Sequence, residues 1–251
     1  MFNFFAKENA DVNGRFYITD TDFNHIKNVL RMKQGDEFLV SFEGKSHLCT
    51  LEELSEGQAT AKIITENYQS TELPIYIHLF QGLPKADKME LIIQKCTELG
   101  VSEITPVEMS RCVVKIEEKK KKSKTERWQA ISESAAKQSK RNLIPRVNTP
   151  LSFANALEQA EELDLFLVPY ENEDGMKATA DCISKIKGGM KIGVLIGPEG
   201  GFDEKEIELC REKGFDVISL GARILRTETA AITSISMLML YSEMNLDGGQ
   251  L

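Results

Sequence analysis

Two short glycine-bearing segments near the C-terminus combine residue types that could bind a ligand. Residues 197–201, Gly-Pro-Glu-Gly-Gly, follow the apolar run 192–196, and residues 221–230 follow a second apolar stretch. A glycine-rich turn lets a ligand approach the backbone, and a helix N-terminus after it offers free N–H groups. Two such loops at the ends of buried strands would form a concave site, which is where open α/β sheets bind ligands.

The first loop lacks the spacing of the common phosphate-binding motifs. No Gly-Lys-Ser/Thr follows it as in a Walker loop, and Pro198 and Glu199 interrupt any G-x-G-x-x-G pattern. Glu199 is a poor neighbour for a phosphate, whereas it suits a cationic ligand or one with amino or hydroxyl donors. A tight strand-to-helix turn without a ligand is the alternative interpretation.

The second loop concentrates charge between two apolar elements. Arg223, Arg226 and Glu228 lie within six residues of one another. Charges in such a connection are usually paired, bound to a ligand, or both. An internal salt bridge between Arg226 and Glu228 that supports the turn is the alternative, and it is compatible with a ligand role.

The elements that position these loops alternate between strand and helix from residue 75 onward. Apolar runs predict strands, and 3.6-residue periodicity with capping signals predicts helices. Asp203 with Glu206, and Asp87 with Glu90, have capping-box spacing. The pattern predicts an α/β domain with a mostly parallel sheet covered on both faces. The expected strands are 75–80, 104–107, 165–168, 192–196 and 217–220, and the expected helices are 87–99, 125–139, 203–213 and 229–244.

The first seventy residues show a different pattern. Short β-type runs at 38–40, 46–51 and 59–64 are separated by glycine turns, and one helix is capped by Asp20 or Thr21. This organisation predicts a compact β-barrel module. The polar stretch 66–72 is the expected linker to the second domain.

Composition restricts the class of protein. The chain of 251 residues has a net charge of −8, which counts mildly against a nucleic-acid binder, although binding depends on local patches. Locally basic stretches occur, including Lys119–Lys124, which we expect to be a solvated loop able to touch phosphates. Five scattered cysteines without CxxC spacing, no signal-peptide pattern and no membrane-spanning run predict a cytoplasmic protein.

Together the two loops resemble the RsmE family. These are SPOUT-superfamily methyltransferases that act on N3 of a uridine in small-subunit (16S) ribosomal RNA. The segments 196–202 and 220–230 carry the resemblance, and three further segments agree with it in order along the chain: 25–31 (HIKNVLR), 95–101 (KCTELGV) and 138–141 (QSKR).

The resemblance implies a fold, a cofactor and partners. It implies a PUA-like β-barrel that binds RNA over residues 1–70 and a SPOUT domain with a C-terminal trefoil knot over residues 71–251. It also implies S-adenosyl-L-methionine as cofactor, ribosomal RNA as partner, a homodimer, and neither metal nor membrane. The cofactor would contact the following residues: Leu167, Pro169, Ile196, Gly197, Glu199, Gly200, Gly201, Leu220, Gly221, Ile224, Leu225, Thr227, Thr229 and Ala230.

Methylation of uracil N3 requires loss of the imide proton, so a base or an anion-stabilising cation is expected. Arg226 and Arg223 could stabilise the anion, and Glu228 or Glu199 could accept the proton; we favour an arginine-centred role. The expected RNA contacts are Arg15, His25, Lys27, Arg31, Lys85, Lys88, Gln138 and Arg141. Three alternatives stay open: a non-catalytic RNA-binding dimer, methylation of a different rRNA or tRNA nucleotide, and a nucleotide-dependent enzyme.

Overall fold

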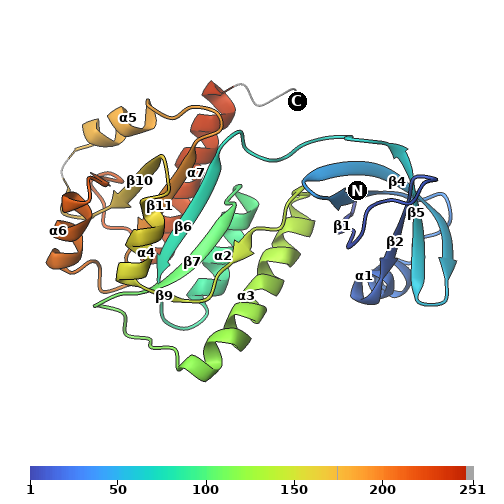
Figure 1. Ribbon diagram of the computed structural model, residues 1–251, viewed down its shortest axis with the longest axis horizontal. Helices are drawn as coiled ribbons and strands as arrows, with labels where there is room; N and C mark the ends of the chain where they lie inside the picture. The colour runs from blue at the N-terminus through green and yellow to red at the C-terminus, as the bar shows by residue number, and fades with distance from the viewer. Residues whose placement is uncertain (174, 247–251) are drawn as a thin grey trace. The chain divides into compact units, whose positions relative to one another are not determined.

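A computed structural model of the chain describes residues 1–173 and 175–246. The chain forms two compact units, each with its own core (Figure 1). The first unit comprises Met1–Glu72 together with Ala136–Ile144, and the second comprises Leu73–Ala135 and the described chain from Pro145 onward.

The first unit contains a curled five-stranded sheet in the order β1-β3-β4-β5-β2. Its strands are β1 (Asn3–Phe5), β2 (Arg15–Thr19), β3 (Glu37–Phe42), β4 (Lys45–Ser55) and β5 (Gln58–Thr65). β1 pairs with β3 in parallel, and the other pairs are antiparallel. Alternate residues such as Phe16, Ile18, Phe38 and Val40 point into one core. The three predicted strands are confirmed, whereas β1 and β2 were not predicted.

The helix of the first unit differs from its prediction. α1 (Asp20–Asn24) continues directly into a π-helical turn, η1 (His25–Val29). Neither Asp20 nor Thr21 caps it: the N-cap residue is Thr19, and no side chain makes a cap hydrogen bond. Asp20 instead has φ of 57° and its carboxylate binds Lys7.

The second unit is built on a seven-stranded parallel sheet. The order is β12-β10-β11-β6-β7-β8, with β9 also paired to β7. The strands are β6 (Tyr76–Gly82), β7 (Glu103–Glu108), β8 (Arg146–Val147), β9 (Leu151–Ser152), β10 (Leu165–Pro169), β11 (Lys191–Ile196) and β12 (Asp216–Ile218). The predicted α/β class with a mostly parallel sheet is confirmed.

Helices cover both faces of this sheet (Figure 1). α2 (Lys88–Glu98), α3 (Glu118–Gln138), α5 (Lys177–Ile183) and α7 (Thr227–Asn245) contribute to the larger core. α4 (Phe153–Ala160) and α6 (Glu204–Glu212) pack on the opposite face against aromatic residues of β6 and β10.

The local helix signals had mixed outcomes. The capping box at Asp203 and Glu206 is present, as predicted. The box expected at Asp87 is wrong, because Asp87 is the N-cap residue but its side chain makes no cap hydrogen bond. The loop expected at Lys119–Lys124 is also wrong: these lysines form the first turns of α3, where ion pairs with acidic neighbours such as Glu117 and Glu118 accompany the helix. The short elements β8, β9, α4 and α5 were not predicted.

A polar cluster lies where β6 and β7 begin. Nε2 of the buried His78 lies 2.7 Å from Oγ1 of Thr105, and its Nδ1 lies 3.9 Å from Glu103. Tyr76 and Asn148 donate hydrogen bonds to the Glu103 carboxylate. Burial lowers the pKa of His78 to about 4, although the charge of Glu103 opposes this, so His78 is neutral near pH 7.

The C-terminal segment brings the second glycine loop to the first. β12 pairs with β10 at one edge of the sheet, whereas α7 packs against α2, β6 and β11. Residues 219–226 must therefore cross the carboxyl ends of β10 and β11, where residues 197–201 also begin. Among the described helices, none combines the length and apolar character needed to cross a bilayer.

Candidate functional site

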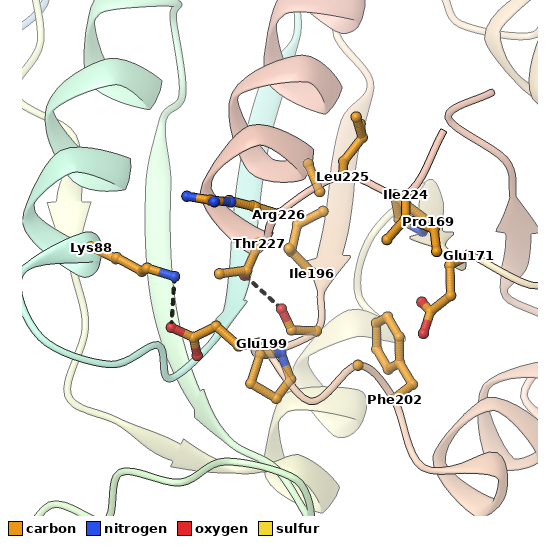
Figure 2. Close-up of a pocket in the computed structure, with 14 residues that line it drawn as sticks. Lys88, Pro169, Glu171, Ile196, Glu199, Phe202, Ile224, Leu225, Arg226 and Thr227 are labelled. Carbon is orange, nitrogen blue, oxygen red and sulfur yellow. Dashed lines mark hydrogen bonds and ion pairs between the residues drawn. The ribbon is translucent and has the colours of Figure 1, made fainter. Parts of the chain in front are cut away.

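The two glycine-bearing loops form the walls of one cavity. It has a volume of about 370 Å³ and lies at the carboxyl ends of β10 and β11 (Figure 2). Its lining residues are Lys88, Pro169, Glu171, Ile196, Gly197, Pro198, Glu199, Gly201, Phe202, Ile224, Leu225, Arg226, Thr227 and Ala230. A smaller cavity beside it shares Pro169, Glu171, Leu225 and Ala230 and adds Leu220 and Gly221.

A buried hydrogen-bond network ties the two loops together. Oγ1 of Thr227, at the start of α7, donates to the carbonyl oxygen of Gly197 over 2.7 Å (Figure 2). The same oxygen accepts a hydrogen bond from Nε2 of Gln81 over 2.9 Å, and Nε2 also donates to the carbonyl oxygen of Gly82. Gln81 is 0% exposed. The end of β6 therefore fixes Thr227, which in turn fixes the first loop.

Glycine is required where backbone segments meet at the cavity. A Cβ on Gly82 would lie 2.7 Å from the backbone nitrogen of Pro198 and 2.8 Å from the sulfur of Met109. Gly201 has φ of 68°, and a Cβ there would lie 2.6 Å from a carboxylate oxygen of Glu171. These contacts let the first loop pack against the end of β6 and leave the Glu171 carboxylate at the cavity wall.

Lys88 of α2 is held between two carboxylates. Its Nζ lies 3.0 Å from Glu199 Oε1 and 3.4 Å from Glu228 Oε2 (Figure 2 shows the first pair). The backbone N–H of Lys85 also donates to Glu199 Oε1 over 3.0 Å. Burial favours a higher pKa for Glu199, but the hydrogen bonds from Lys85 and Lys88 outweigh it and lower the pKa. Glu199 is therefore ionised and a weak base.

The charges of the second loop do not form the salt bridge considered from the sequence. Glu228 pairs with Lys88 rather than with Arg226, so that interpretation is wrong. Within the described chain, neither Arg226 nor Arg223 makes an ion pair, and both are exposed. The Arg226 side chain extends toward the side of the cavity occupied by Lys88 and Glu199 (Figure 2). A free guanidinium is thus available to a ligand in the cavity.

Most residues predicted to contact the cofactor line one of the two cavities. The larger cavity takes nine of them, and the smaller cavity adds Leu220 and Gly221. Leu167, Gly200 and Thr229 line neither: Leu167 is buried in the core, while Gly200 and Thr229 are exposed. Their contacts with a cofactor stay predictions.

The three residues predicted to be catalytic do not all line the same cavity. Arg226 lines the larger cavity, whereas Arg223 lines the smaller one and Glu228 lines neither. Oε2 of Glu228 is buried, and among the described residues its one ion-pair partner is the Lys88 ammonium. Glu228 is therefore placed to hold Lys88 rather than to touch a ligand directly.

The residues predicted to bind RNA differ in their availability within the first unit. His25, Lys27 and Arg31 are exposed on α1, η1 and the following turn, and Gln138 is exposed at the end of α3. Arg15 forms an ion pair with Glu52.

Arg141 does not fit its predicted role. It is 3% exposed, and its guanidinium makes several hydrogen bonds to the carboxylate of Glu72. Because its donors are used inside the first unit, Arg141 is placed to hold the chain there rather than to reach RNA. In the second unit, Lys85 is exposed, whereas Lys88 is committed to the cavity.

Three residues at the site were missed by sequence reasoning. Glu171 lines both cavities, Gln81 anchors Thr227, and Arg111 lies against the first loop, where its Nη1 donates to the carbonyl oxygen of Gly200 over 3.4 Å. Glu171 and Gln81 each follow or end a predicted strand, which was a usable signal for a site at that edge. Arg111 carried no such signal.

Comparison with known proteins identifies the family. The RNA methyltransferase domain family matches residues 71–239, and the RNA methyltransferase PUA domain family matches residues 18–64. The chain is 37% identical, over 95% of its length and 95% of the relative, to ribosomal RNA small subunit methyltransferase E of Bacillus subtilis. This chain belongs to that RNA methyltransferase family. The resemblance to RsmE proteins is thereby confirmed.

Other family members agree in sequence and in structure. The ribosomal RNA small subunit methyltransferase E of Mesomycoplasma hyopneumoniae is 34% identical over 92% of this chain and 96% of that protein. The crystal structure of ribosomal RNA small subunit methyltransferase E from Neisseria gonorrhoeae, bound to S-adenosyl methionine, has a TM-score of 0.81. That structure is 32% identical and covers 96% of this chain and 97% of its own. In the part of the present chain that the structure describes, no group of three or more His, Cys, Asp or Glu residues could hold a metal ion.

Proposed function

We propose that this protein transfers a methyl group from S-adenosyl-L-methionine to N3 of a uridine in 16S ribosomal RNA. Its family consists of RNA methyltransferases, and its relatives are named for action on small-subunit ribosomal RNA. A relative is solved with S-adenosyl methionine bound. The observation that carries the proposal is a cavity in which two glycine loops meet beside Arg226, which has no ion-pair partner in residues 1–173 and 175–246.

The residues of the cavity fit S-adenosyl-L-methionine. A volume of about 370 Å³ lies within the ~300–1,000 Å³ typical of small-molecule pockets. Apolar side chains suited to an adenine ring surround one part of it: Pro169, Ile196, Leu225 and Ala230. The carboxylates of Glu171 and Glu199 suit the ammonium, sulfonium and hydroxyl groups. When bound, this cofactor supplies an activated methyl group on a sulfonium.

Arg226 provides the electrostatic assistance that the acceptor needs. As N3 of uracil loses its proton, negative charge spreads to O2 and O4, and a positioned cation stabilises that charge. Arg226 is exposed at the cavity and unpaired within the described chain, so it can make this contact without first breaking an ion pair. The low pKa of Glu199 makes it a weak proton acceptor, which favours the arginine-centred role over a carboxylate base.

Lys88 and Glu228 act together as a support. Glu228, which does not line the cavity, forms an ion pair with the Lys88 ammonium, and Lys88 in turn pairs with Glu199 at the cavity wall. We assign Glu228 to this positioning role. Arg223 remains a proposed contact for the substrate or for the cofactor from the smaller cavity.

The two domains and the assembly follow from the same proposal. We propose that residues 1–70 act as the RNA-binding domain and residues 71–251 as the methyltransferase domain, threaded as a trefoil knot. We also propose a cytoplasmic homodimer. Leu240 and Met244 of α7 are 47% and 72% exposed, and apolar side chains of this size on an exposed face of the helix suit a second copy.

A methyl-transfer assay tests the function. The protein is incubated with small ribosomal subunits or 16S rRNA and labelled S-adenosyl-L-methionine, and the RNA is digested to nucleosides. We expect 3-methyluridine as the labelled product. Arg226→Ala should abolish transfer while leaving cofactor affinity within a few-fold. Full activity of that variant would reject the role of Arg226, and a different labelled nucleoside would reject the acceptor atom.

A further inference from the structure

The connection between β7 and α3 crosses the second unit (Figure 1), and it carries a row of exposed side chains. Residues 111–117 belong to no helix or strand, with residue 111 in a turn and residue 113 in a bend, and their side chains alternate between the core and solvent. The inward side chains pack against the larger core: Cys112, Val114 and Ile116. The outward ones are Arg111, Val113, Lys115 and Glu117, and Glu117 forms ion pairs with Lys119 and Lys120 of α3. We call Arg111, Val113 and Lys115 the rim strip.

The rim strip begins directly beside the first glycine loop. Arg111 donates to the carbonyl oxygen of Gly200 over 3.4 Å and forms an ion pair with Asp203 at 3.6 Å. A Cβ on Gly200 would lie 3.0 Å from the carbonyl oxygen of Arg111. The backbone N–H of Ser110 also donates to Glu206 over 2.8 Å. These contacts fix the strip against the loop that forms one wall of the cavity.

The chemistry of the strip suits a strand of nucleotides. Val113 is 66% exposed and lies between two cationic side chains, in a chain whose net charge is −8. Lys115 has no ion-pair partner in the described chain, whereas Lys119, Lys120 and Lys121 at the start of α3 pair with Glu117 and Glu118. Cations bind phosphates, and an aliphatic side chain between them can pack against a sugar or a base.

We propose that the rim strip binds the RNA strand next to the nucleotide that is methylated at the cavity. This inference rests on the proposed function, because an RNA strand whose target base reaches the methyl donor in the cavity must cross the rim of the cavity on both sides of that base. Gly200 belongs to that rim, and Arg111 packs on Gly200. The strip therefore contacts phosphates and a sugar or base face near the target. The previously expected contact through Lys88 is replaced by it, since Lys88 is committed to two carboxylates.

Two variants separate the strip from the catalytic site. Lys115→Glu reverses one charge, and Val113→Ser removes the aliphatic contact. The matched control is Lys187→Glu, which makes the same charge change at an exposed lysine before β11, at the opposite end of the strands. Each protein is assayed for S-adenosyl-L-methionine affinity by calorimetry and for methyl transfer to 16S rRNA over a range of salt concentrations.

We expect Lys115→Glu to raise KM for RNA about tenfold, with a smaller increase for Val113→Ser, and cofactor affinity within twofold of wild type. The slope of log KM against log salt should fall by about 0.7 for each lost phosphate contact if the RNA is single-stranded there. Lys187→Glu should show neither change.

Three outcomes would overturn the proposal. If Lys115→Glu matches the Lys187→Glu control in KM and in salt slope, the strip does not touch RNA. If cofactor affinity falls in parallel with activity, the strip only supports the cavity. If RNA kinetics are unchanged but sedimentation shows an altered assembly, the strip is a protein interface. Failure of the proposed function is distinguishable, because wild-type protein would then transfer no methyl group to 16S rRNA.

Discussion

Removal of the Thr227 hydroxyl is the most direct test of how the cavity is held. Thr227→Val keeps the side-chain shape but removes the oxygen that donates to Gly197 and accepts from Gln81, over 2.7 and 2.9 Å. The variant leaves a buried carbonyl oxygen and a buried amide N–H without this partner. Gln81 keeps its bond to the carbonyl of Gly82, so its loss is partial.

The expected destabilisation follows from the two lost hydrogen bonds. A buried polar group left unpaired costs about 1–3 kcal/mol. The methyl group that replaces the hydroxyl gains about 0.8 kcal/mol from burial. Allowing for the bond that Gln81 retains, we expect the free energy of unfolding to fall by about 1–3 kcal/mol. For a unit of this size each kcal/mol lowers the Tm by about 2–4 °C.

The effect on function distinguishes a positioning role from stability alone. If Thr227 holds the Gly197 loop in place for the cofactor, the Kd for S-adenosyl-L-methionine should rise about three- to tenfold, since tenfold corresponds to ~1.4 kcal/mol. Thr125→Val is the matched control, because its hydroxyl bonds within α3 to the carbonyl of Lys121. Calorimetry measures Kd, and thermal denaturation measures Tm.

Two results would refute this reasoning. An unchanged Tm would mean that the hydroxyl makes no stabilising bonds in the folded protein. A lowered Tm with cofactor affinity equal to that of Thr125→Val would mean that the network stabilises the fold without positioning the loop. A double-mutant cycle with Gln81→Met should give a coupling energy of about 0.5–3 kcal/mol, as for residues in direct contact.

Three further predictions concern the cavity and the sheet. Gly82→Ala should lower the free energy of unfolding in urea by about 3 kcal/mol, because its Cβ would lie 2.7 Å from a backbone nitrogen of the first loop. The control Gly188→Ala should resemble wild type, since its Cβ would lie 3.9 Å from the nearest atom. Lys88→Met should move the acidic limb of the kcat/KM profile to higher pH, because Lys88 helps to lower the pKa of Glu199; an unmoved limb would contradict this coupling. Burial lowers the pKa of His78 from an ordinary 6.5 to about 4 in the folded chain, so the unfolded chain binds more protons between these two pH values. The free energy of unfolding should therefore fall by up to about 3 kcal/mol as the pH drops from 6.5 to 4. His78→Gln should flatten that dependence, and an equally steep fall in the variant would assign it to other groups.

The spacing of apolar residues and the helix-capping residues predicted the main helices and strands, because both signals depend on neighbours within a few residues. The capping box at Asp203 is an example, since both of its partners lie in one turn. The same signal was misleading at Asp87, whose φ and ψ of −90° and 6° are not those of a side-chain cap, and the preceding Ala86 has φ of 54°. The residues on either side of this turn bind the first loop, since the backbone N–H of Lys85 and the ammonium of Lys88 both contact Glu199. Such long-range contacts are invisible in local sequence.

The lysine run before residue 125 shows the opposite error. Four consecutive lysines repel one another in isolation, so a solvated loop was expected. In the structure, Glu117 and Glu118 lie close enough to pair with Lys119, Lys120 and Lys121, and the buried Trp128 anchors the helix further along. Ion pairs with these two glutamates offset the repulsion among the lysines at the start of α3, and packing of the helix against the core adds stability that composition alone could not indicate.

At the site, the loops were predictable, but the residues that support them were not. The glycines and charges of residues 197–201 and 221–230, and their position after apolar runs, indicate a ligand site. Gln81 and Lys88 reach them from segments more than one hundred residues earlier in the chain, because β6 lies beside β11 in the sheet and α2 lies beside α7. Such contacts depend on strand order, which local patterns do not encode. The consequence is chemical: Lys88 was expected on the RNA surface, yet its pairing with Glu199 and Glu228 makes it part of the cavity, where Arg226 has no ion-pair partner among the described residues.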